Sequence, residues 1–191
     1  MKLLFVPKDK AEDLMNLAID EIDSIELEEI KSELKKIDEN FSIKEINIGE
    51  GADWIMILAI LNGITTVFLL GDKIDKGIDG WVKIGKRINV ILSKSDRVYL
   101  DKESASFIVV DYLSEKYQIS SLKLLMESQV PIKDLSGMLL DRTSSDFIAT
   151  PYSIYFMTFE INEHILLSLS IRSDGLVAEH HNFDRNDFIP F

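Results

Sequence analysis

The sequence predicts a mixed α+β fold, in which N-terminal helices on a small sheet surround a central apolar helical hairpin and a C-terminal antiparallel β-meander follows. Three observations predict it. Apolar residues recur at helical spacing through much of residues 8–94. The run Trp54–Leu70 contains no charged residue. Apolar and polar residues alternate through much of residues 153–183, which is typical of strands with one buried face.

The first fifty residues predict two short strands with two helices between them. Leu3–Val6 is a strand that Pro7 ends, and Phe41–Ile48 is a second strand. Lys8–Ile22 and Ile25–Ile37 carry narrow apolar stripes with acidic residues outside them, so both are expected to be surface helices on a sheet.

The uncharged run Trp54–Leu70 is predicted to be the central buried helix. It follows Gly49-Glu50-Gly51, which has two glycines of a dinucleotide-binding loop but has Trp54 where the third is required. We therefore expect a tight turn there and no cofactor. Small and polar residues share one side of the predicted helix and form a candidate interaction stripe: Ala59, Asn62, Gly63 and Thr66. Membrane insertion is the alternative, since a spanning helix needs at least about 17 apolar residues.

Asp72–Lys94 is predicted to be a basic amphipathic helix that completes the helical hairpin beyond Gly71. Its glycines predict close packing or a break near Gly77–Gly80. A membrane-responsive protein that uses this 54–94 hairpin is one alternative function.

The second half of the chain predicts a strand, a helix and then the meander. The expected helix is Glu103–Tyr117, with Ala105, Ile108, Val109 and Tyr112 in helical register. Asn162-Glu163 and Ser173-Asp174-Gly175 are the predicted turns between the last strands. The expected strands are Arg97–Leu100, Leu122–Met126, Ser153–Ile161, His164–Arg172 and Leu176–Phe183.

Length and composition predict one cytoplasmic domain. The 191 residues suit a single domain, 1–191, with a soft lobe boundary near 95 that separates a helix-rich 1–95 from a strand-rich 96–191. The chain has no cysteine, which excludes a disulfide scaffold, and its first residues do not resemble a signal peptide. Abundant Lys and Ile suggest a bacterial source. The net charge of -12 argues against a dedicated nucleic-acid binder.

The candidate metal site combines Glu179 with the histidines of the last strands, since the chain has no cysteine. Strand alternation is expected to place Glu179 and His181 on one face and His180 on the other. A carboxylate and an imidazole could bind zinc or another divalent ion. The other interpretation is that these are polar residues on the outer face of a hairpin.

No nucleophile elbow and no P-loop pattern occurs in the sequence. We therefore expect a non-catalytic bacterial cytoplasmic protein that acts through protein–protein contact. An immunity, antitoxin-like or phage-related accessory protein would suit this size and acidity, with a basic protein partner or a homo-oligomer as the contact. A metal-dependent hydrolase that uses Glu179 and His181 is the second alternative.

Overall fold

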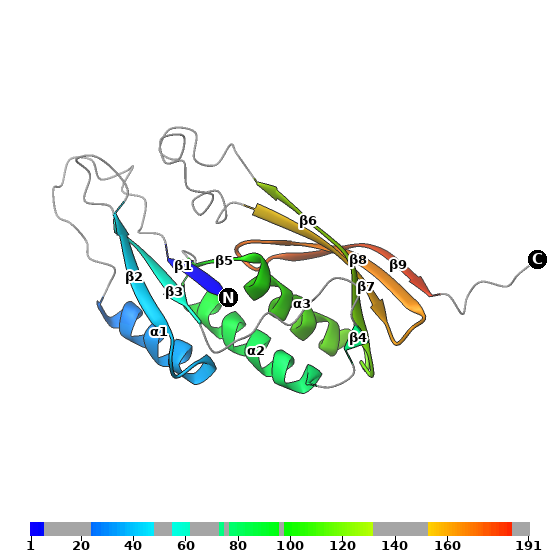
Figure 1. Cartoon of the computed structure of the whole chain (residues 1–191), viewed down its shortest axis with the longest axis horizontal. Helices are drawn as coiled ribbons and strands as arrows, with labels where there is room; N and C mark the ends of the chain where they lie inside the picture. The colour runs from blue at the N-terminus through cyan, green and yellow to red at the C-terminus, as the bar shows by residue number, and fades with distance from the viewer. Residues whose placement is uncertain are drawn as a thin grey trace, which may run out of the picture.

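The computed structural model describes residues 1–5, 24–47, 55–61, 73–74, 77–95, 98–131 and 153–184. These residues form three helices and two antiparallel sheets, as Figure 1 shows. The strand order is β2-β3-β1-β5 in the first sheet and β4-β6-β7-β8-β9 in the second. The mixed α+β class predicted from the sequence is confirmed.

The first sheet is assembled around β1 (Lys2–Phe5), which pairs with β3 (Ile55–Ile60) on one side and β5 (Val98–Leu100) on the other. β2 (Ser42–Asn47) pairs with the far edge of β3. The strands predicted near residues 3–6, 41–48 and 97–100 are therefore confirmed. Each strand is short, so β1 obtains its stability from two neighbours and from buried side chains such as Leu3.

The prediction of a helix across Trp54–Leu70 is wrong for Ile55–Ile60, which is strand β3. The consecutive residues Leu58 and Ala59 are both buried, so the two faces of this strand are both covered. A strand with two buried faces contains no polar alternation, and periodicity cannot distinguish it from a buried helix. The rest of the predicted helix, residues 62–70, and the loop Gly49–Gly51 lie outside the described residues.

The second half of the predicted hairpin is a helix, but a shorter one than expected. α2 (Ile78–Lys94) begins after Gly77, whose φ of 86° lies in the left-handed region that favours glycine. This confirms the break predicted near Gly77. The preceding Lys73–Ile74 is strand β4, which pairs with β6. α1 (Ser24–Ile37), which confirms the helix predicted over Ile25–Ile37, packs against α2.

The central buried helix is α3 (Lys102–Lys116), not the apolar run. Every residue from Ser104 to Asp111 is buried, because α3 contacts α2, β1, β5 and β8. Its buried serines bond to backbone: the Ser104 hydroxyl donates to the carbonyl of Lys2 at 3.0 Å. Small, internally bonded side chains allow neighbouring elements to pack closely around the helix.

The contact between α2 and α3 depends on a glycine. An added Cβ at Gly85 would lie 2.3 Å from the carbonyl oxygen of Phe107 and 2.8 Å from Cβ of Asp111. One turn away, the rings of Trp81 and Phe107 meet edge to face with centroids 6.5 Å apart. Gly85 therefore lets the two helix backbones approach more closely than any side chain would permit.

The second sheet contains the meander predicted from the sequence. Its strands are β6 (Leu122–Pro131), β7 (Ser153–Ile161), β8 (Ile165–Arg172) and β9 (Val177–Asp184), each antiparallel to the next. Asn162 and Glu163 have φ values of 53° and 68°, the geometry of a two-residue hairpin turn. The predicted hairpin at these residues is confirmed.

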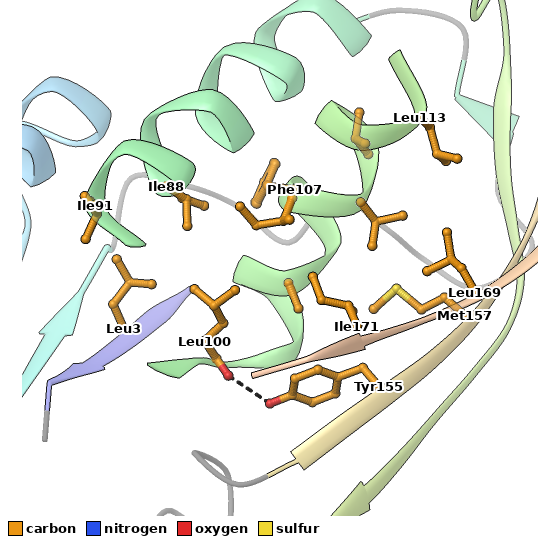
Figure 2. Close-up of a cluster of buried hydrophobic side chains, with 14 of the residues drawn as sticks. Leu3, Ile88, Ile91, Leu100, Phe107, Leu113, Tyr155, Met157, Leu169 and Ile171 are labelled. Carbon is orange, nitrogen blue, oxygen red and sulfur yellow. Dashed lines mark hydrogen bonds between the residues drawn. The ribbon is translucent and has the colours of Figure 1, made fainter. Parts of the chain in front are cut away.

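The inner face of the second sheet packs on α3, as Figure 2 shows for Tyr155, Met157, Leu169 and Ile171. The two sheets also meet directly at β5. The Leu100 N–H donates to the carbonyl of Ser173 at 2.7 Å, and the Tyr155 hydroxyl donates to the carbonyl of Leu100 at 3.0 Å. One hydrophobic cluster thus contains side chains from both sides of residue 95.

Candidate interaction surface

The outer face of the second sheet is exposed, in contrast to the inner face that covers α3. Strand registers place its side chains in four rows across β6 to β9. We define the outer face by these rows: Val130–Ile154–Arg172; Ser128–Phe156–Ser170–Ala178; Met126–Thr158–Ser168–His181; and Lys123–Glu160–Leu166–Phe183.

Large apolar side chains are exposed on the outer face. Met126 is 59% exposed, Val130 49%, Phe183 44% and Phe156 36%. Phe156 lies opposite Ser128, so Met126 and Val130, each two residues from Ser128, are its diagonal neighbours. Diagonal side chains on one face are about 7–8 Å apart, within reach of an aromatic ring. These three residues therefore form an apolar patch on β6 and β7.

His180 extends the patch onto β9. Its imidazole lies 5.9 Å from the Phe156 ring, centroid to centroid, with 30° between the ring planes. Its Nε2 is 2.8 Å from the Ser170 hydroxyl. The hydrogen bond holds the imidazole beside Phe156. The apolar patch is therefore bordered on β9 by a polar aromatic side chain.

A β-bulge separates the two residues predicted to share a metal ion. His181 is opposite Ser168 and Glu179 is opposite Leu169, which leaves His180 as an extra residue between them. Leu169 points inward and Ser168 outward, so Glu179 and His181 occupy opposite faces. The expectation that they share a face is wrong, because one extra residue reverses the alternation.

Glu179 already has a cationic partner on α3. Its carboxylate is 2.9 Å from Lys116 Nζ, which also lies 2.6 Å from the Tyr112 hydroxyl. Hydrogen bonds to Tyr112 and then to Glu179 raise the pKa of Lys116. Within the described ranges, no group of three or more His, Asp or Glu is placed to hold a metal ion.

The centre of the outer face contains no Asp, Glu, Lys or Arg. The two middle rows contain hydroxyl, imidazole and apolar groups, and Arg172, Lys123 and Glu160 stand only in the end rows. Arg172 Nε donates to Asp174 Oδ1 at 3.0 Å. The net charge of the chain is -12, so the outer face differs in charge from the protein as a whole.

Of the predicted interaction stripe, only Ala59 lies within the described residues. Ala59 lies in β3, opposite Leu3, and is completely buried. Its small side chain fits within the first sheet, so the stripe is wrong at this position. Asn62, Gly63 and Thr66 lie outside the described residues. Among the described helices, none is long and apolar enough to cross a membrane.

A second feature is a cavity of about 350 Å³ beside the start of α3. Leu4, Leu58 and Tyr99 contribute to its wall, together with Asp101 and Glu103. Asp101 caps α3, because its carboxylate accepts from the Ser104 N–H at 2.8 Å. Two carboxyl groups therefore line the cavity beside apolar side chains.

The two carboxyl groups have pKa values shifted in opposite directions. Burial, and then the negative charge of Glu103, raises the pKa of Asp101 to about 7. Burial opposes the shift at Glu103, but the hydrogen bond from Asp101 lowers the pKa of that carboxyl. Such a pair can exchange a proton or attract a cation. Among the described lining residues, no other acidic side chain is present.

We predict that the Asp101 carboxyl titrates near pH 7. Carbon NMR of the side-chain carboxyl over a pH series measures this, and Asp101→Asn supplies the assignment while retaining a capping oxygen. When folding raises the pKa of a carboxyl, its protonated form stabilises the folded protein. This stabilisation is complete below the pKa of the unfolded chain, about 3.9, and is lost as pH rises through the pKa of the folded protein. The variant should therefore gain stability relative to wild type as pH rises from about 4 to about 7. A midpoint near 4 would contradict the assignment.

Comparison with protein-family models, curated proteins and solved structures finds no match to this chain.

Sequence reasoning did not identify the outer face or the carboxyl pair. Period-two alternation places Phe156 on one face of β7 and Tyr155 and Met157 on the other. Alternation alone does not show which of the two faces packs on α3. Asp101, three residues before Ser104, matches a helix-capping position, but the raised pKa depends on burial between two sheets.

Proposed function

We propose that this protein is non-catalytic and acts through protein–protein contact, with the outer face of the second sheet as the contact surface. The exposed patch of Phe156, Met126 and Val130 carries this proposal. Exposed apolar groups gathered on one face are typical of interaction sites, and aromatic residues at the centre of such sites often dominate binding.

The energetics of the patch favour contact with another protein. Fully burying a large apolar side chain from water contributes about 1.5–3 kcal/mol, and the exposed part of each patch side chain supplies a share of this. The patch offers three such side chains, and Ser170 and Thr158 supply hydroxyl groups for hydrogen bonds around them. An immunity, antitoxin-like or phage-related accessory role in a bacterial cytoplasm would use a surface of this kind.

The two alternative functions have less support. A metal-dependent hydrolase would need Glu179 and His181 together, whereas the bulge places them on opposite faces and Lys116 engages Glu179. A membrane-responsive hairpin would need residues 54–94 to be helical, whereas Ile55–Ile60 is a strand.

Photo-crosslinking in the native host tests the proposal. A photoreactive amino acid is placed at position 156 of the full chain and, as a matched control, at Val90, which is 41% exposed on α2. We expect a discrete protein adduct from position 156 and none from position 90. No adduct from position 156, or the same adducts from both positions, would contradict the proposal.

A further inference from the structure

We infer that the partner at the outer face is a second copy of the chain, packed face to face as a two-fold dimer. This inference rests on the proposed function of that face and adds the identity of the partner. Three properties of the face carry it: its charge, the arrangement of its rows and its area.

Charge restricts where two copies can meet. Each chain carries a net charge of -12, so two copies repel one another wherever acidic surfaces approach. α1, for example, presents Glu28 and Glu29 to solvent. The middle rows of the outer face contain no Asp, Glu, Lys or Arg. Contact there brings two uncharged surfaces together.

A two-fold axis that runs across the strands brings the end rows of the two copies over one another. Such an axis places the row containing Arg172 over the row containing Glu160 of the second copy, and the reverse. Arg172 then has a carboxylate of the other chain nearby in addition to Asp174. Lys123 lies opposite Glu160 in its row and Arg172 is paired with Asp174, so each end of the face balances its own charge and does not repel the end placed over it.

The same axis places large side chains over small ones. Phe156 lies in the second row and Thr158 in the third, both on β7, so each Phe156 meets Thr158 of the other copy. On β6, Met126 meets Ser128 in the same way. Each aromatic ring also comes beside the thioether of the other chain, a favourable contact. This alternation lets the two faces interdigitate as sheets do in a sandwich.

The area of the face indicates a weak, reversible dimer. Four strands about 4.8 Å apart and rows spanning some seven residues at about 3.3 Å per residue give a flat area of roughly 400 Å² per copy. A standard stable interface buries about 800 Å² per partner. We therefore expect a dimer that dissociates on dilution.

Sedimentation velocity of the full chain over a wide concentration series tests the inference. Wild type should shift from monomer to dimer, and Phe156→Glu should raise the dissociation constant at least about tenfold. Val90→Glu adds the same charge on α2 and should leave dimerisation unchanged. Arg172→Glu and Glu160→Arg should each weaken the dimer, and the double variant should recover it. Thermal unfolding of each variant establishes that it is folded.

The outcomes separate this inference from the proposed function. If wild type stays monomeric while position 156 crosslinks to a different protein, the second copy is excluded and the proposed function stands. If a dimer forms but Phe156→Glu leaves it intact, the dimer uses another surface and the inference is overturned. If wild type is monomeric and position 156 gives no adduct, both fail.

Discussion

Phe159→Ala should lower the free energy of unfolding by about 3–5 kcal/mol, the range for deleting a buried aromatic ring. Phe159 is completely buried on the inner face of β7, where its ring belongs to the core around α3. Removing it eliminates the transfer energy of the ring and leaves a cavity that rigid neighbours fill only in part. Urea unfolding followed by circular dichroism measures the change.

Phe156→Ala is the matched control, because it makes the same chemical change on the opposite face of the same strand. Phe156 is partly exposed, and the cost should be below about 1 kcal/mol. Equal losses from the two substitutions would mean that β7 does not present its faces as described.

Gly85→Ala is expected to lower the free energy of unfolding by about 1–3 kcal/mol, as overpacking does. The new Cβ would meet the Phe107 carbonyl at 2.3 Å, and a backbone atom of a buried helix cannot move aside as a flexible side chain can. The loss arises although alanine favours a helix over glycine by about 1 kcal/mol. The midpoint of urea unfolding reports it.

Gly80→Ala provides the comparison within the same helix. An added Cβ at Gly80 meets nothing within 4 Å, so only the helix propensity changes. This substitution should stabilise the protein by about 0.5–1 kcal/mol. If Gly85→Ala also stabilises, α2 and α3 do not approach as closely as the structure has them.

Local pattern was sufficient for much of this fold. Alternation and turn residues located the strands from Ser153 onward, since each strand has one buried face and a short turn such as Asn162-Glu163. Helical spacing located α1 and α2, although the helix predicted over Asp72–Lys94 also included Lys73–Ile74, which is strand β4. These elements have one face in contact with the core and one in solvent, and that asymmetry is what a sequence pattern records.

Elements that are buried on all sides were the ones that pattern misjudged. β3 lacks polar alternation because Leu58 and Ala59 are both covered, so its pattern predicts a buried helix. α3 was recognised as a helix, but nothing local indicated that Ser104 to Asp111 would all be buried. Burial on several sides depends on partners far away in the chain, which a local window does not contain.

The candidate surface shows a similar limit. The bulge at His180 shifts every later side chain of β9 by one position, so simple alternation misplaced His181 relative to Glu179. Alternation separates the two faces of β7 but does not show which of them is the inner face. Only the position of α3 determines that Phe159 is core and that Phe156 faces outward.

Carbene footprinting measures most directly whether the outer face is a contact surface. The protein is labelled in dilute purified form and inside the native host, and modification is compared at Met126 and Phe156, with Val90 on α2 as the reference. Our account predicts strong labelling of Met126 and Phe156 in dilute solution, protection of both inside cells, and unchanged labelling of Val90. Equal labelling of Met126 and Phe156 in the two conditions would contradict it.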